Sequence, residues 1–225
     1  MGVLNVIKVV CMGDSITEGF GVEPSESYPS VLQNLLGEEY RVVNKGVCCT
    51  TTLNVENEKG IMGMPYMREA RYKEALQEKG NIYVVLLGTN DAQDGMDDTQ
   101  DFKYEQNDMI SRKADFVPCY RQILQAVKAA SPGAVIYAGL PIPVQNCIWR
   151  KHQESYLKEI RACIKEAAAA EGVSLLDIEG AFTALPKEEQ LKLYQEDNLH
   201  PNKEGYKLIA RTVAGVLKNK RHDFT

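Results

Sequence analysis

The 225-residue chain has no excess of basic residues, because 31 Asp and Glu outnumber 26 Lys and Arg. The formal net charge is -5 and the pI is near 5.4. Proteins that bind nucleic acids usually gather Lys and Arg on one face, so this composition disfavours a DNA or RNA partner. The mean hydropathy of -0.31 leaves no room for membrane spans, and we expect no stable association with a membrane.

The sequence also lacks the marks of a disulfide-rich secreted protein. Its six cysteines include no C-x-x-C pair, and the chain is long for a disulfide scaffold. Residues 1–10 carry Lys8 inside their only apolar stretch and show no signal-peptide pattern. We therefore expect free thiols, most of them buried, and a cytoplasmic protein. Secretion stays open if a signal peptide was trimmed.

Apolar runs and helical stripes alternate along the chain. Five runs predict strands, at residues 6–12, 40–44, 82–87, 134–140 and 173–176. Apolar residues at helical spacing predict helices over 28–36 behind Ser27, over 116–127, over 156–167 and over 206–217 behind Asn202. This alternation predicts a single α/β domain over residues 1–225, with a three-layer α/β/α architecture, a central parallel sheet of about five strands and a frayed tail from about 219.

Polar motifs that can perform chemistry follow two of these strands and precede the last helix. Gly13-Asp14-Ser15 comes directly after the first strand, and Gly88-Thr89-Asn90-Asp91 follows the third. In parallel sheets, ligands bind beyond the carboxyl ends of the strands. Near the end of the chain, Asp197 precedes His200 by three residues. An Asp and a His can supply the base, and the carboxylate that orients it, for a serine nucleophile.

These motifs, together with Asn44-Lys45-Gly46, resemble the four blocks of the SGNH, or GDSL, hydrolase family, in the same order and over nearly the whole sequence. The resemblance implies a flavodoxin-like fold with Ser15 as nucleophile, His200 as base and Asp197 as its orienting partner. It also implies an oxyanion hole formed by the Ser15 N–H and the Asn90 amide. The family's third donor is a glycine N–H, and that position here is Cys49, which tolerates a positive φ less readily.

Each motif also has a plainer explanation. Gly-Asp-Ser alone is a common turn sequence, and the Asn90-Asp91 pair can merely close a strand, with Asp91 structural in either case. Asp197 and His200 can form a structural ion pair or hold a metal, although no third ligand has a telling spacing. Cys48-Cys49 can be a redox pair, but neighbouring cysteines are awkward to bridge and more often serve as small apolar residues. We expect no metal and no organic cofactor.

The substrate is predicted from weaker signals. Residues 51–79 and 92–111 leave strand ends and can form the rim of the site. We expect Asp14, Tyr66 and Trp149 to contact substrate, and residues 140–144 with Trp149 resemble family members that deacetylate carbohydrates. The predicted activity is a serine esterase acting on short-chain O-acyl esters, such as O-acetyl groups on small molecules or oligosaccharides, because Cys49 would crowd a longer acyl chain.

Two alternatives to this activity stay open. One is a lysophospholipase or thioesterase, which would need an apolar trough near residues 62–67. The other is a carbohydrate-binding module with weak catalysis, because a fold alone does not guarantee chemistry.

Overall fold

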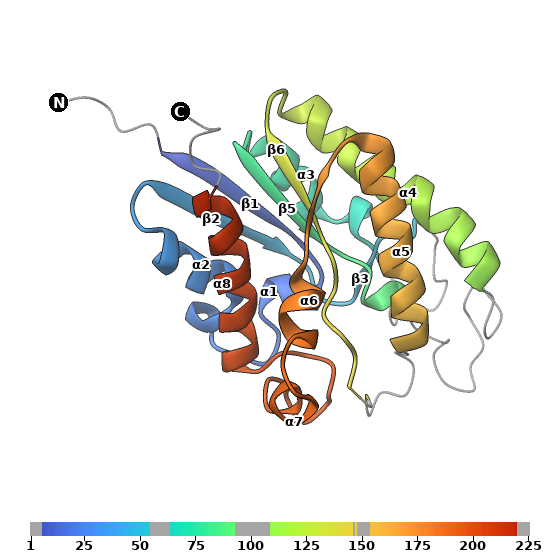
Figure 1. Ribbon diagram of the computed structural model, residues 1–225. Helices are drawn as coiled ribbons and strands as arrows, with labels where there is room; N and C mark the ends of the chain where they lie inside the picture. Colours follow the sequence, from blue (N-terminus) through green and yellow to red (C-terminus); the bar gives the residue numbers. More distant parts are fainter. Residues whose placement is uncertain (1–5, 55–63, 93–108, 146, 148–153, 220–225) are drawn as a thin grey trace.

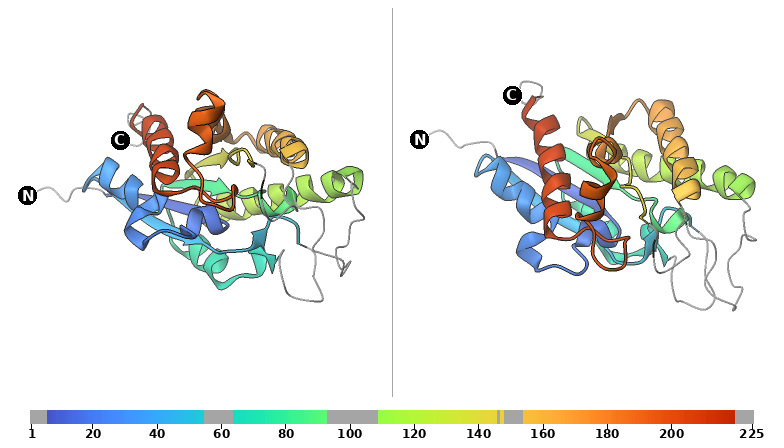
Figure 2. Two further views of the ribbon diagram at one scale, coloured as in Figure 1. Left: turned by 90° about the horizontal axis from the view of Figure 1, so that it is seen from below. Right: turned by 60° about the horizontal axis from the view of Figure 1, so that its bottom comes forward.

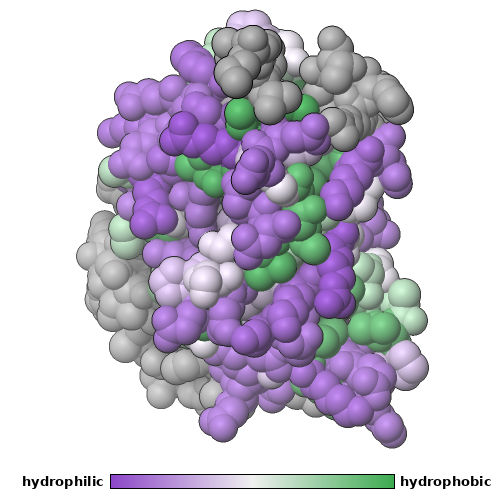
Figure 3. All heavy atoms as spheres, turned by 90° about the vertical axis from the view of Figure 1, so that its left-hand side faces the viewer, coloured by the Kyte–Doolittle hydropathy of each residue, from purple (hydrophilic) through white to green (hydrophobic). Residues whose placement is uncertain are grey.

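The computed structural model describes residues 6–54, 64–92, 109–145, 147 and 154–219, and its centre is a five-stranded parallel sheet (Figure 1). The strands lie in the order β2-β1-β5-β6-β7. Their bounds are β1 (Ile7–Gly13), β2 (Tyr40–Gly46), β5 (Ile82–Leu86), β6 (Val135–Gly139) and β7 (Ser174–Leu176). Outside this sheet, β3 (Thr50–Thr51) and β4 (Met64–Pro65) form a short parallel pair. The side of the molecule nearest the edge strand β2 is largely hydrophilic (Figure 3).

Helices cover both faces of the sheet, which confirms the predicted three-layer α/β/α architecture. In β1, Val9 and Cys11 pack into a core with helices α2, α6 and α8, whereas Val10 and Met12 pack into a second core with α3, α4 and α5. The bounds are α2 (Tyr28–Leu36), α3 (Ala70–Gln77), α4 (Met109–Ala130), α5 (Glu154–Glu171), α6 (Ile178–Thr183) and α8 (Lys203–Asn219). The short elements are α1 (Ser15–Glu18), η1 (Pro24–Glu26), η2 (Tyr66–Arg68), η3 (Asn90–Ala92) and α7 (Lys187–Leu191).

The strand order places the topological switch point of the sheet at the carboxyl end of β1. Counted along the main sheet, the order is 2-1-3-4-5, the flavodoxin-like order, in which the chain reverses direction across the sheet between β1 and β5. Gly13 at the end of β1 lies level with Gly46 on β2 and Leu86 on β5. Segments that leave these three strands therefore emerge at the same end of the sheet, which faces the viewer in the left panel of Figure 2.

Most of the predicted elements are present, with ends shifted by a few residues. Asn202 caps α8 as predicted, because its side-chain oxygen accepts the N–H groups of Glu204 (3.0 Å) and Gly205 (3.2 Å). Ser27 precedes α2, but its hydroxyl donates to the Pro24 carbonyl instead of capping the helix.

One expectation is wrong. All six cysteines are free, but only Cys11 and Cys163 are buried, so most of the thiols are partly exposed. Within the segment predicted as a rim, residues 64–77 form β4, η2 and α3. Among the described helices, none is long and apolar enough to cross a membrane.

Candidate active site

Ser15, His200 and Asp197 lie in a hydrogen-bonded row, although 185 positions separate the serine from the histidine. Ser15 is the first residue of α1, immediately beyond β1, and His200 lies in the segment before α8. The Ser15 Oγ is 2.9 Å from His200 Nε2, and His200 Nδ1 is 2.5 Å from Asp197 Oδ2. Because an ionised carboxylate only accepts, the Nδ1 proton points at Asp197 and Nε2 is left to accept from the serine.

The Asp197 carboxylate also holds the turn that presents His200. Its Oδ1 accepts the backbone N–H groups of Leu199 and His200, each at 2.9 Å. Burial opposes ionisation, but the bonds from the His200 ring and from these two N–H groups hold the pKa of Asp197 below its ordinary value. Asn198 takes the left-handed conformation (φ 57°), which Asn tolerates better than most residues. The Gln145 N–H donates to the Asn198 carbonyl at 3.0 Å and supports the turn from outside.

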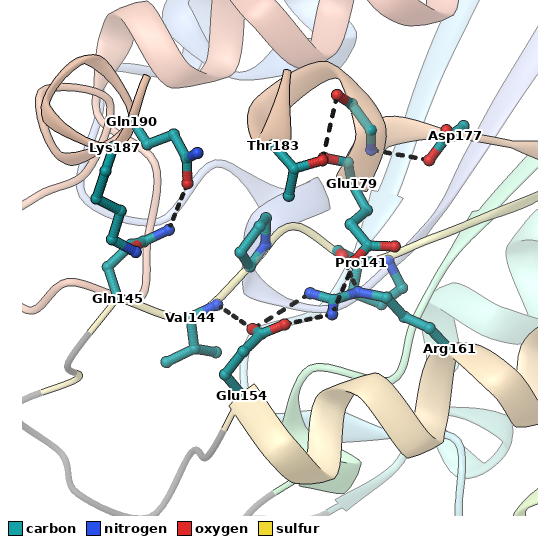
Figure 4. A network of polar contacts seen from close by, with 12 residues as sticks. Pro141, Val144, Gln145, Glu154, Arg161, Asp177, Glu179, Thr183, Lys187 and Gln190 are labelled. Carbon is teal, nitrogen blue, oxygen red and sulfur yellow. Dashed lines mark hydrogen bonds and ion pairs between the residues drawn. The ribbon is translucent and has the colours of Figure 1, made fainter. Parts of the chain in front are cut away.

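A buried arginine fixes the segment that provides this support (Figure 4). Arg161 on α5 is 2% exposed, and its Nε donates to the Pro141 carbonyl at 2.7 Å. Its Nη1 lies 2.5 Å from Glu154 and 3.2 Å from Glu179. Glu154 in turn accepts the Val144 N–H at 2.8 Å. These bonds tie the segment after β6 to α5 and α6. The same segment supports the His200 turn through Gln145.

The three predicted oxyanion donors follow neighbouring strands of the sheet. They are the backbone N–H of Ser15, the backbone N–H of Cys49 and the side-chain amide of Asn90, which follow β1, β2 and β5 at the level end of the sheet. Cys49 has φ 63°, the conformation that a glycine would adopt without strain. The Asn90 amide donates one bond to the carbonyl of Thr50 at 2.9 Å, so it also positions the residue after Cys49.

Asp91 is structural, as predicted. Its two carboxylate oxygens accept the N–H groups of Thr52 and Leu53, each at 2.9 Å. Asp91 therefore ties the chain beyond Cys49 to the end of β5.

Two of the three predicted substrate contacts, Asp14 and Tyr66, lie in the interior. Asp14 is 1% exposed, and its Oδ1 accepts the Ile16 N–H at 2.9 Å as the cap of α1. Tyr66 is fully buried, and its hydroxyl donates to the Lys45 carbonyl at 2.6 Å. Trp149 lies outside the described residues. The side chains of Asp14 and Tyr66 therefore belong to the interior and are not exposed to a ligand.

The sequence analysis missed Phe20, whose ring packs against the ring of His200. The two ring centroids are 4.4 Å apart with the planes inclined at 36°, and Phe20 is 44% exposed. Its carbonyl accepts the Tyr206 hydroxyl at 3.1 Å and the Gln195 amide at 2.8 Å. The signal in the sequence is an aromatic residue between two glycines five positions after the serine.

A metal site is not evident in the described part of the chain, where no group of three or more His, Cys, Asp or Glu side chains is placed to hold an ion. The arrangement of Ser15, His200 and Asp197 suits nucleophilic attack by the serine hydroxyl without a metal.

Comparison with known proteins places the chain in a family. The sequence matches the GDSL-like Lipase/Acylhydrolase family over residues 11–208, which include Ser15, Cys49, Asn90, Asp197 and His200. The chain belongs to this family. It is 33% identical over 220 residues to an acetylxylan esterase of Xylanibacter ruminicola. That alignment covers 95% of this chain and 44% of the relative, so the chain spans less than half of that protein.

Solved structures of GDSL-type and related hydrolases share the fold. The lipase/acylhydrolase from Enterococcus faecalis superposes with a TM-score of 0.69 at 23% identity, covering 96% of this chain and 97% of the other. Est24, a carbohydrate acetylesterase from Sinorhizobium meliloti, superposes with a TM-score of 0.67 at 15% identity, covering 95% and 99%. At these identities the likeness concerns the architecture alone.

Proposed function

We propose that the protein is a serine esterase that hydrolyses short-chain O-acyl esters, with O-acetyl groups on carbohydrates as the preferred substrates. The proposal rests on the hydrogen bonds that link Ser15, His200 and Asp197. Ser15 Oγ lies 2.9 Å from His200 Nε2, and His200 Nδ1 lies 2.5 Å from Asp197 Oδ2. A serine hydroxyl is a poor nucleophile at neutral pH unless an oriented base accepts its proton. Asp197 orients that base and stabilises the imidazolium that forms.

The reaction proceeds through an acyl-enzyme. His200 accepts the hydroxyl proton as Ser15 attacks the acyl carbon, and the oxyanion of the tetrahedral intermediate receives hydrogen bonds from Ser15, Cys49 and Asn90. His200 then protonates the leaving alcohol and afterwards activates a water molecule that releases the acid. Removing one such donor typically costs roughly 10²–10³ in rate.

Two features support a small acyl group on a sugar. The Cys49 side chain stands where the family has glycine, so it narrows the space beside the oxyanion position. Phe20 exposes an aromatic surface next to His200, on which a sugar ring can pack. The 33% identical relative is itself named an acetylxylan esterase.

The test is a comparison of initial rates for p-nitrophenyl acetate, butyrate and octanoate, followed by acetate release from acetylated xylo-oligosaccharides. We expect the highest rate with acetate in the wild type and none above background in Ser15→Ala. Ser174→Ala, which changes an exposed serine on β7, is the matched control and should retain full activity.

Undiminished turnover by Ser15→Ala would refute the mechanism. Rates that rise steadily with acyl length would refute the short-chain preference and favour a lysophospholipase or thioesterase. Tight sugar binding by a protein whose serine does not react with an organophosphonate would favour the binding module.

A further inference from the structure

Cys48 and Cys49 lie in a turn between β2 and β3 that is fixed on both sides. The Cys48 N–H donates to the Glu18 carboxylate at 2.7 Å, which ties the turn to α1. On the other side, Asn90 holds the Thr50 carbonyl at 2.9 Å. The turn therefore has little freedom to separate the two thiols.

The two sulfur atoms face one another across this turn. Their Sγ atoms are 3.3 Å apart, and both residues are partly exposed. A disulfide bond is about 2.05 Å long, so the sulfurs need only a small further approach to bond. We propose that Cys48 and Cys49 are a reactive dithiol, and that a hydroperoxide converts it into a disulfide between the two neighbouring residues.

The pair is set up for unequal reactivity. When Cys49 is ionised, the Cys48 thiol donates a hydrogen bond to its sulfur, which lowers the pKa of Cys49 to about 7 against the opposing effects of burial and of the Glu18 carboxylate. The same bond raises the pKa of Cys48 above its ordinary value. Because the thiolate is the nucleophile, Cys49 is the sulfur that attacks an oxidant, and Cys48 resolves the product.

The oxidation balances in two steps. The Cys49 thiolate attacks the terminal oxygen of the hydroperoxide, so an S–O bond forms, the O–O bond breaks and an alcohol, or water from hydrogen peroxide, leaves. The Cys48 thiol then attacks the sulfenic sulfur of Cys49, the S–S bond forms, the S–O bond breaks, and the thiol proton leaves with the hydroxyl as water. The thiols lose two electrons and the peroxide gains them.

This disulfide would be easy to reduce. Neighbouring α-carbons across a trans peptide are about 3.8 Å apart, shorter than the roughly 4.4–6.8 Å of ordinary disulfides. Strained and exposed disulfides have more oxidising potentials than structural ones. The pair therefore suits a reversible change and not a permanent staple.

Formation of this disulfide would affect the ester site through the backbone. Closing the eight-membered ring rotates the Cys48–Cys49 backbone, and the N–H of Cys49 is one of the three oxyanion donors. This step rests on the proposed esterase function. Loss of that donor predicts a rate lower by roughly 10²-fold, restored on reduction.

The experiment treats the full chain with hydrogen peroxide, blocks free thiols with iodoacetamide and maps tryptic peptides without reduction. Cleavage after Lys45 and Lys59 releases one peptide whose only cysteines are Cys48 and Cys49. We expect this peptide to lose two hydrogen atoms and take up no iodoacetamide. Across a time course, the fraction of oxidised peptide should equal the fraction of lost p-nitrophenyl acetate turnover, and dithiothreitol should restore both.

Two variants make the assignment specific. Cys48→Ser keeps the basal rate, but its peptide should gain oxygen at Cys49 instead of losing hydrogen. Cys119→Ser removes a partly exposed thiol on α4 and should oxidise at the 48–49 peptide like the wild type.

A peptide that stays alkylated twice, or that gains oxygen without passing through the hydrogen-loss form, would overturn the dithiol proposal. A disulfide that forms while turnover is unchanged would overturn its link to the oxyanion donor. If no ester turnover is found at all, the peptide masses still decide the dithiol chemistry, so its failure is distinct from failure of the esterase proposal.

Discussion

Asp14 carries a buried carboxyl directly before the candidate nucleophile, and its replacement by Asn should remove a pH dependence from the stability of the fold. Burial raises the pKa of Asp14 to about 7 from 3.8, and the charge of Asp91 adds to the effect. Between pH 4 and 7 the folded chain holds a proton that the unfolded chain releases, so this group makes the wild type less stable as the pH rises through that window.

The magnitude follows from the size of the shift. One pKa unit corresponds to about 1.4 kcal/mol, so charging Asp14 costs roughly 4 kcal/mol at pH 8 and under about 2 kcal/mol at pH 5. Asn cannot ionise, but its carbonyl oxygen can still accept the Ile16 N–H that caps α1. The free energy of unfolding of Asp14→Asn minus that of the wild type should therefore increase by about 2–3 kcal/mol between pH 5 and pH 8.

Urea denaturation of both proteins at pH 5, 6, 7 and 8 measures this difference directly. Any effect of the substitution on packing is the same at each pH, so it cancels when the difference in unfolding free energy is compared between pH values. A difference between the two proteins that is the same at pH 5 and pH 8 would show that Asp14 is already ionised in the fold, and would refute the reasoning.

Three further substitutions test the surroundings of His200. Asp197→Asn should lower kcat by a factor of roughly 10³–10⁴, because the amide no longer selects the His200 tautomer that accepts from serine. Full activity in steady-state kinetics would contradict the proposed role of Asp197. Phe20→Ala should lower kcat by up to about tenfold with a stability change under about 1 kcal/mol, because the ring contacts His200 but is 44% exposed. Arg161→Gln should lower the free energy of unfolding, measured by urea denaturation, by about 3 kcal/mol, because two carboxylates lose a buried partner. Glu154 is 45% exposed, so solvent limits this loss. An unchanged midpoint in that variant would mean that solvent replaces the pair.

The strands and the strand-end motifs were predictable because their signals are local. β5 and the part of β1 after Lys8 are buried on both faces, so they appear as apolar runs, and the polar residues that follow them mark the carboxyl edge of the sheet. Helix α3 was missed because only Tyr72 and Ala75 of its eight residues are buried, too few to make an apolar stripe.

Other features depend on contacts between distant parts of the chain. Tyr66 was predicted to contact substrate because it stands in a long segment that leaves a strand end, but a bond to the Lys45 carbonyl holds it in the core. Arg161 gave no signal, since charged residues are rarely fully buried unless they are paired, and its partner Glu179 belongs to another helix. The closeness of the Cys48 and Cys49 sulfurs accompanies a positive φ at Cys49 that propensities do not show.

The long separation between Ser15 and His200 means that the candidate catalytic pair exists only in the tertiary fold. Helix α8, which begins three residues after His200, lies beside α2 (Figure 1), so the docking of these two helices holds His200 at the serine. In an unfolded chain the Ser15 hydroxyl has no base beside it, so the proposed mechanism requires the completed tertiary structure. Ester turnover would then serve as a reporter of finished folding, lost first when the carboxyl-terminal helix detaches and regained only when it returns.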